Sequence, residues 1–182
     1  EDDIDAALKM ALANHPLDEQ RMCVLGFSYG GYSALVAAVR WPKRFRCVIS
    51  VSGVSDRNLQ FTASDTGRSE HGRKQLELFM GNPDNAREKL IDTSPAYQHE
   101  KLRVPVMLAH GIDDERVDYE QTLRMQRMLE LDGRPAVGLV FEKEGHAIQD
   151  LDNLDTLWRG IAGFLQQNLG KAEASPPPAQ PH

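Results

Sequence analysis

A serine lies between two glycines in a G-x-S-x-G motif at residues 26–30. An apolar run at 22–25 precedes the motif and a helix-forming run at 32–39 follows it, so the motif is expected on a tight turn between a strand and a helix. Such a turn strains the backbone of the serine and exposes its hydroxyl at a helix N-terminus, where negative charge is favoured. The pattern predicts Ser28 as a catalytic nucleophile, and the alternative is an ordinary glycine-rich turn.

A nucleophilic serine needs a base, and histidine is the usual one. His146 closely follows a predicted strand at 137–141 and comes after acidic candidates in the chain, so it is the predicted base. His110 directly ends an earlier predicted strand at 104–109 and precedes those acids, so we interpret it as a structural residue that shapes its loop. The other histidines lie in polar stretches without a preceding strand or close to the C-terminus: His15, His71, His99 and His182.

The acid that orients the base is expected just beyond the strand at 104–109. Three adjacent acidic residues follow that strand, and their types and positions alone barely separate them. They are Asp113, Asp114 and Glu115. For two of the three, the expected role is a solvated turn or a helix cap.

Three motifs together resemble the catalytic domain of the prolyl oligopeptidase family of serine peptidases, which includes dipeptidyl peptidases and acylaminoacyl peptidases. They are Gly26-Phe27-Ser28-Tyr29-Gly30-Gly31-Tyr32, His110-Gly111-x-x-Asp114-x-Arg116-Val117 and Glu144-Gly145-His146. The resemblance covers about residues 1–170 and implies an α/β-hydrolase fold, a mostly parallel sheet flanked by helices. In this family the acid is the fourth residue after the histidine of the His-Gly pair, which selects Asp114.

The resemblance also implies a mechanism and substrate contacts. Acyl transfer would proceed from Ser28 through an acyl-enzyme, with the backbone N–H of Tyr29 as one donor to the oxyanion. Arg116 matches a position that reaches a substrate carbonyl in prolyl oligopeptidase-like members. Val117 and the Tyr29 ring match the apolar pocket for the residue before the cleaved bond. Candidates to extend that pocket are Val54, Leu59 and Phe61.

Composition limits the classes of protein to which the chain can belong. Its 182 residues, 41% hydrophobic, suffice for one domain with a sizeable core. A net charge of −6 argues against nucleic acid or an anionic membrane as partner. No metal-ligand spacing or glycine-rich phosphate loop is present, so no cofactor or metal is expected. Cys23 and Cys47 lie in predicted buried strands and are expected to pack in the core, which indicates nothing about redox compartment.

Strands and helices alternate along the chain without an internal repeat. Helices are expected at 2–14, 31–41, 119–131 and 153–168, and strands at 22–27, 46–51, 104–109 and 136–141. Residues 55–100 form a polar, mostly helical excursion, with a helix start at Asn82-Pro83-Asp84. Asp118 and Gln121 resemble a capping box. An apolar stripe on the last helix is expected to face the sheet: Leu154, Leu157, Trp158, Ile161, Phe164 and Leu165.

An α/β-hydrolase usually has several strands before its nucleophile, whereas this sequence reaches the nucleophile strand after a single helix. We therefore expect a C-terminal part of a longer peptidase, with a β-propeller upstream as the resemblance implies, and a strand at 22–27 with an unpaired edge. The proline-rich residues 171–182 are expected to be a disordered tail. Compartment and oligomeric state are not indicated.

Two other functions remain open. A carboxylesterase or thioesterase could use the same Ser-Asp-His arrangement, because fold and triad do not specify the acyl substrate. A non-catalytic interaction module could keep the fold, although intact Ser28, Asp114 and His146 argue against it. The favoured prediction is a serine peptidase that acts on oligopeptides.

Overall fold

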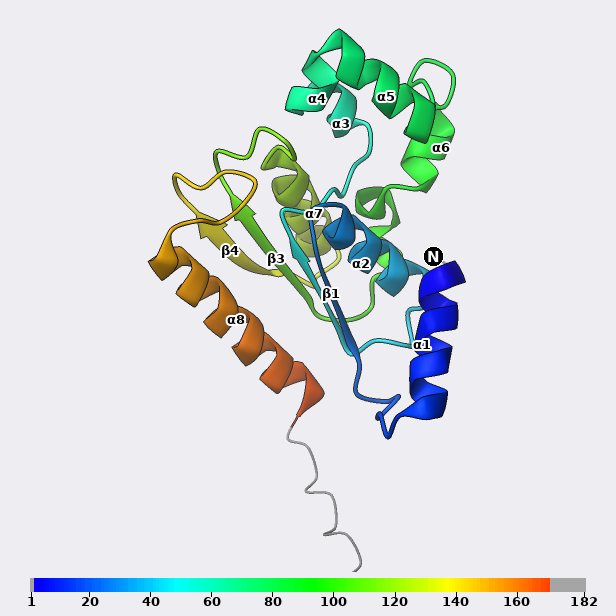
Figure 1. The fold of residues 1–182 in the computed structure, drawn as a ribbon, viewed down its shortest axis with the longest axis vertical. Helices are drawn as coiled ribbons and strands as arrows, with labels where there is room; N and C mark the ends of the chain where they lie inside the picture. Colours follow the sequence, from blue (N-terminus) through cyan, green and yellow to red (C-terminus); the bar gives the residue numbers. More distant parts are fainter. Residues whose placement is uncertain (1, 171–182) are drawn as a thin grey trace, which may run out of the picture.

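A computed structural model describes residues 2–170 of the chain. Its centre is one parallel sheet of four strands in the order β1-β2-β3-β4 (Figure 1). The strands are β1 (Cys23–Phe27), β2 (Cys47–Val51), β3 (Val106–Gly111) and β4 (Val137–Phe141). Helical segments supply the crossovers that parallel neighbours require. All four strands therefore end at the same edge of the sheet, where open α/β folds gather their sites.

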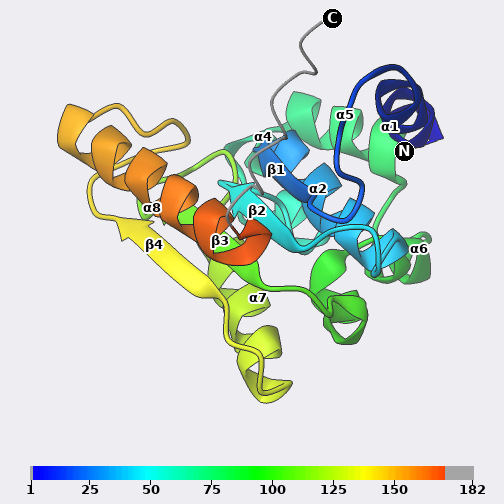
Figure 2. The same cartoon turned by 90° about the horizontal axis from the view of Figure 1, so that it is seen from below.

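Helices cover both faces of the sheet, as Figures 1 and 2 show. One face carries α2 (Tyr29–Arg40), the 3-10 segment η1 (Pro95–Lys101) and α7 (Glu120–Leu131). The other face carries α8 (Leu151–Leu169). The remaining N-terminal helix, α1 (Asp2–Asn14), lies on the opposite side of the molecule from α8. The predicted α/β fold with a parallel sheet between helices is confirmed.

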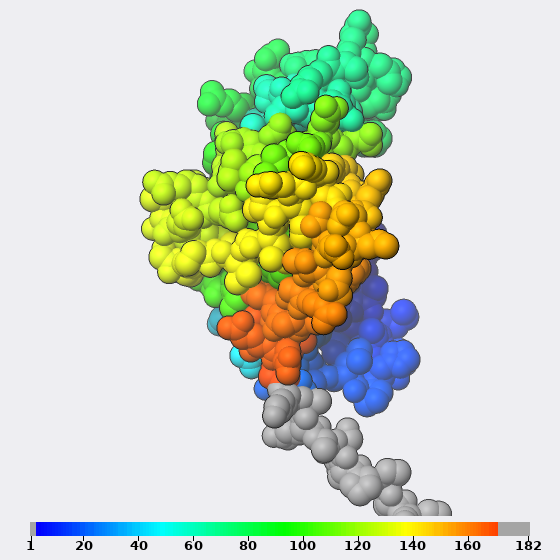
Figure 3. Space-filling view, turned by 90° about the vertical axis from the view of Figure 1, so that its left-hand side faces the viewer, coloured from blue at the N-terminus to red at the C-terminus, as the bar shows by residue number. Residues whose placement is uncertain are grey.

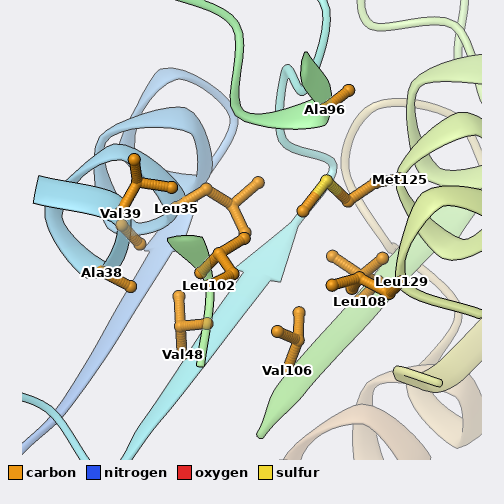
Figure 4. Close-up of a cluster of buried hydrophobic side chains, with 11 residues drawn as sticks. Leu35, Ala38, Val39, Val48, Ala96, Leu102, Val106, Leu108, Met125 and Leu129 are labelled. Atoms are coloured by element: carbon orange, nitrogen blue, oxygen red, sulfur yellow. The ribbon is translucent and has the colours of Figure 1, made fainter. Parts of the chain in front are cut away.

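Two hydrophobic clusters fill the space between these layers. On the α2 and α7 face, Leu35 and Met125 pack over Val48, Val106 and Leu108 of the strands (Figure 4). All five residues of β2 and all six of β3 are buried, as expected for central strands covered on both faces.

The last helix buries most of its predicted apolar stripe. Leu157, Ile161 and Phe164 are buried against the sheet, and Leu154 and Leu165 pack beside them. Trp158, predicted to be part of the same stripe, is not buried against the sheet: it is 54% exposed. One residue further along a helix lies about 100° around the axis, which turns Trp158 away from the sheet that Leu157 faces.

The segment between β2 and β3 is mostly helical, as predicted. It contains α3 (Leu59–Thr62), α4 (Asp65–Arg68), α5 (Glu70–Met80) and α6 (Arg87–Asp92). These helices lie beyond the carboxyl ends of the strands and form the top of the molecule in Figures 1 and 3. They therefore lie over the carboxyl ends of the strands, where Ser28 follows β1.

The helix start predicted at 82–84 is wrong by several residues. Asn82 accepts a hydrogen bond from the backbone N of Asp84 through its own side chain, at 2.8 Å, and its backbone oxygen accepts one from Ala86 N. This local turn uses the asparagine as a turn former. The helix itself, α6, begins only at Arg87.

The capping box predicted before α7 is half correct. Asp118 accepts a hydrogen bond from the backbone N of Glu120 at 2.9 Å, which satisfies one free donor at the start of the helix. Gln121 does not close the box. Its buried side chain instead accepts hydrogen bonds from the backbone N of Ser55 and Asp56, at 2.9 and 2.7 Å, and so ties α7 to the segment after β2.

The two cysteines form a disulfide, which the expectation of simple core packing missed. Cys23 of β1 and Cys47 of β2 are paired residues in the parallel register, with Cα atoms 4.7 Å apart, and their sulfurs are bonded. Cys47 is buried in the cluster under α8 and the partly buried Cys23 packs against that cluster, in line with the expected core packing. The two cysteines are 24 residues apart in the sequence, and only the register of β1 with β2 places them side by side.

Candidate active site

The turn between β1 and α2 presents Ser28 in a strained conformation. Its φ of 55° and ψ of −121° lie in a region that residues with a side chain rarely adopt, at a cost on the order of 1–3 kcal/mol. The turn closes tightly enough that a Cβ on Gly26 would lie 2.0 Å from the carbonyl oxygen of Gly30. The backbone N of Ser28 donates to the carbonyl of Val51 at 2.8 Å, which anchors the strained residue to β2.

The loop between β4 and α8 brings His146 to the serine. Its Nε2 lies 2.9 Å from Ser28 Oγ, and its Nδ1 lies 2.8 Å from Asp114 Oδ2. A carboxylate can only accept, so Nδ1 carries the hydrogen and Nε2 is left with the lone pair that faces the serine hydroxyl. This tautomer is the one that a base acting on Ser28 requires.

Asp114 is buried and fully hydrogen-bonded. Its Oδ1 accepts from the backbone N of Arg116 and of Val117, both at 2.9 Å, while its Oδ2 accepts from His146. Burial alone would raise the pKa of this carboxyl. The hydrogen bonds from His110, Val117 and His146 outweigh burial and hold the pKa of Asp114 below its ordinary value. The residue is therefore an ionised acceptor beneath the histidine.

Next to Asp114, His110 is fully buried and contacts the same carboxylate oxygen. Its Nε2 lies 2.7 Å from the carbonyl oxygen of Val117 and 3.1 Å from Asp114 Oδ2. Because a carbonyl oxygen cannot donate, Nε2 carries a hydrogen, which these two acceptors share. Nδ1 lies 2.8 Å from Thr122 Oγ1 on α7. Sequence reasoning assigned His110 to the shape of the loop; its direct contact with the acid was not foreseen.

The loops that carry Asp114 and His146 are held together by their backbones. Asp113 N donates to the carbonyl of Glu144 at 2.9 Å, and a Cβ on Gly111 would lie only 2.3 Å from that same oxygen. The Glu144 side chain is buried and accepts from Gln149 N, Asp150 N and Asn153 Nδ2 at 2.8 to 3.0 Å. The glutamate thus fixes the path of the loop from His146 into α8. Sequence reasoning used it only as part of a motif.

Tyr29, predicted to supply an oxyanion donor, is the first residue of α2. A backbone N–H in the first turn has no acceptor four residues earlier in its own helix. The Tyr29 ring is 73% exposed and stacks at a tilt against Tyr32, with centroids 5.5 Å apart.

The two other predicted substrate contacts lie in different environments. Arg116 is exposed, and its Nε donates to Asp65 Oδ2 at 3.0 Å, an ion pair that ties the acid loop to α4. Val117 is only 4% exposed, and its backbone binds Asp114 and His110.

A pocket of about 370 Å³ lies beside the nucleophile turn. Tyr29 and Val54, both named as pocket candidates, line it together with Tyr32 and the apolar side chains of α5. Phe61 is buried in the core, 3% exposed, under Arg73. Two polar side chains that sequence reasoning did not single out also line the pocket: Arg57, in the turn before α3, and Gln60, in α3.

Residues 2–170 contain no cluster of three or more histidine, cysteine or acidic side chains with the geometry of a metal site. Within the same residues, no helix combines the length and apolarity that crossing a bilayer requires.

A parallel sheet with a serine on the turn after one strand, an acid after another and a histidine after the last has the arrangement of the α/β-hydrolase class. The sequence matches the model of the prolyl oligopeptidase family over residues 1–172. The chain belongs to this family, as the three motifs predicted.

Individual relatives agree with the family assignment. The chain is 25% identical over 171 residues to dipeptidyl aminopeptidase BIII of Pseudoxanthomonas mexicana, covering 93% of this chain and 25% of that protein. It is 30% identical over 172 residues to dipeptidyl peptidase family member 6 of Caenorhabditis elegans, covering 92% and 23%. The fold matches Pyrococcus horikoshii acylaminoacyl peptidase with a TM-score of 0.84 at 22% identity, covering 95% and 28%. The chain thus spans about a quarter of the length of these relatives.

Proposed function

We propose that this chain is the catalytic part of a serine peptidase that hydrolyses peptide bonds of oligopeptides. The observation that carries the proposal is the position of His146, whose two ring nitrogens lie within hydrogen-bond distance of Ser28 and of Asp114. Similarity to dipeptidyl and acylaminoacyl peptidases favours a peptide as substrate. The β-propeller that the resemblance implies upstream stays a prediction.

In the acylation step, Ser28 Oγ attacks the carbonyl carbon of the scissile bond while His146 Nε2 takes the hydroxyl proton. Asp114, ionised and buried, stabilises the imidazolium that forms. Collapse of the tetrahedral intermediate breaks the C–N bond, and the proton on Nε2 passes to the leaving amine. The serine is then esterified with the acyl half of the substrate.

The negative charge on the carbonyl oxygen needs donors during this step. The backbone N–H of Tyr29 is the donor that we assign, because it directly follows the nucleophile and has no acceptor within α2. Loss of one such donor costs on the order of 3 kcal/mol of transition-state stabilisation.

Deacylation reverses the roles with water as the nucleophile. His146 Nε2 takes a proton from water as the oxygen attacks the ester carbon, and returns a proton to Ser28 Oγ as the ester bond breaks. The acid product leaves and the original tautomer is restored. The two steps together consume the peptide and one water, and they return Ser28 and His146 to their starting states.

The test uses the natural protein with whatever sequence flanks these residues. Wild type should react rapidly with a fluorophosphonate and cleave a peptide amide, and Ser28→Ala should do neither. Ser33→Ala, one turn further along α2, is the matched control and should behave as wild type. Cleavage of an ester without cleavage of the matched amide would favour an esterase, and no labelling of folded protein would favour an interaction module.

A further inference from the structure

The pocket beside the nucleophile turn has an uneven chemical lining. Most of this lining is apolar. It consists of Val54 and of three side chains of α5: Leu76, Phe79 and Met80. Because Tyr29 also lines it, directly after Ser28, a side chain next to the attacked carbonyl is the part of a substrate that can enter it. The residues that depart from the apolar lining should therefore decide which side chain is preferred.

Arg57 brings a positive charge to this wall. Its Nη1 donates to Thr93 Oγ1 at 2.7 Å, and its guanidinium carbon lies 5.8 Å from the centre of the Tyr32 ring. Its backbone N donates to Ser94 Oγ at 2.8 Å, which fixes the start of the side chain. Both partners of the guanidinium, Thr93 and Tyr32, are uncharged. Among residues 2–170, no carboxylate forms an ion pair with it.

The adjacent acid does not neutralise Arg57. Asp56 is fully buried, and its Oδ2 is bound by Arg124 and by the hydroxyl of Tyr97, the latter at 2.9 Å. That carboxylate already has a cation of its own. The guanidinium of Arg57 is held in place by uncharged partners and lacks the anion that arginine normally meets in a partly buried position.

Gln60 adds a second unused donor. Its side chain is nine-tenths buried in the pocket wall, and its Nε2 has no hydrogen-bond partner among the described residues. Buried amide groups without a partner are rare in folded proteins and call for an explanation, such as an acceptor supplied by a ligand.

We propose that this pocket selects peptides with an acidic side chain, glutamate first, on the amino side of the cleaved bond. The inference rests on the proposed function of the site. The methylenes of glutamate would contact the apolar wall, and its carboxylate would supply acceptors to the Arg57 guanidinium, which suits carboxylate geometry, and to the Gln60 amide. A lysine at this position would meet Arg57 as a like charge.

The experiment compares four peptide substrates that differ only at this residue: glutamate, glutamine, norleucine and lysine. With the natural full-length protein we expect the kcat/KM for glutamate to exceed that for glutamine by at least about tenfold, with lysine the poorest, since hydrogen bonds between ionised groups are about twice as strong as neutral ones. Labelling of Ser28 by a fluorophosphonate is measured in parallel.

Variants assign the preference to the pocket. Arg57→Met should lower kcat/KM for glutamate by about tenfold or more and place norleucine above it. Gln60→Leu should reduce the advantage of glutamine over norleucine. Arg68→Met, an exposed arginine on α4, is the matched control and should keep the wild-type ranking.

Each outcome decides the matter. Equal or better cleavage of norleucine by wild type, with Ser28 labelled normally, overturns the acidic preference and leaves the peptidase intact. A glutamate preference that survives Arg57→Met overturns the assignment to this pocket. Absence of labelling in folded wild type overturns both the proposed function and the preference that rests on it.

Discussion

Asp114 lies between two histidines, and the same carboxylate oxygen accepts from both. His146 connects the acid to the serine, while His110 approaches from the buried side at 3.1 Å and is itself held by Val117 and Thr122. A carboxylate fixed from behind cannot rotate away from the histidine in front of it. His110 therefore acts as a positioning residue for the proposed base, through the acid.

Replacement His110→Phe keeps a ring of similar size and removes the hydrogen bond to Asp114. We expect kcat/KM to fall about 10- to 100-fold, since a hydrogen bond to a charged group contributes about 1.5–3 kcal/mol. The pKa of Asp114 should rise with the loss of this donor, and an NMR titration of its side-chain carboxyl would measure the rise. The exposed His71→Gln is the control. An unchanged pKa of Asp114 in folded His110→Phe would reduce His110 to a packing role.

The depressed pKa of Asp114 also predicts how stability depends on pH. A carboxyl with a folded-state pKa below its unfolded value stabilises the protein above the unfolded pKa, about 4, and loses that contribution as pH falls through the folded value. The difference in unfolding free energy between wild type and Asp114→Asn should therefore shrink as pH is lowered from 6 towards 2. Urea unfolding of both proteins at a series of pH values measures this difference. A difference that does not vary over this range would contradict the depressed pKa.

At the scale of elements, the disulfide joins two strands that the fold already pairs. In the unfolded chain the same bond closes a loop across a separation of 24 residues, and the loss of chain entropy corresponds to about 3 kcal/mol of stability. Reduction should lower the free energy of unfolding by about that amount, measured in urea with and without reductant. The double variant Cys23→Ala, Cys47→Ala should not respond to reductant. Two free thiols in denatured, unreduced protein would contradict the bond.

The loop between β4 and α8 depends on one buried carboxylate. Three donors converge on Glu144. The hydrogen bond from Asn153 lowers its pKa most, and those from the backbone N–H groups of Gln149 and Asp150 lower it further. Glu144→Gln replaces one acceptor oxygen by an amide nitrogen that cannot accept, so one of these donors loses its partner. We expect kcat to fall about tenfold through displacement of His146, with little change in KM. Glu142→Gln, on an exposed position of the same loop, is the control. A drop in stability alone would exclude a positioning role.

At the scale of the whole molecule, local patterns predicted the architecture well, because each strand and helix carries its own periodicity and the motif residues follow strand ends. Pairings between distant segments were harder to foresee. The bond between Cys23 and Cys47 depends on the register of β1 with β2, and the link from Gln121 to Ser55 depends on where α7 packs. The polar lining of the pocket likewise arises only when the segment after β2 folds over the nucleophile turn.

The sheet leaves a hydrophobic edge at β1, which pairs only with β2 in residues 2–170. Leu25 and Phe27 on this strand are 40% and 39% exposed. An exposed edge strand with apolar side chains is a template for pairing with another chain.

Residues 1–182 prepared alone should therefore self-associate with rising concentration, as light scattering would detect. Leu25→Lys places a charge on the edge and should shift association to higher concentration, whereas Val140→Lys tests the β4 edge as a comparison. A chain that stays monomeric, or associates equally in Leu25→Lys, would show that the β1 edge is not the surface through which copies meet.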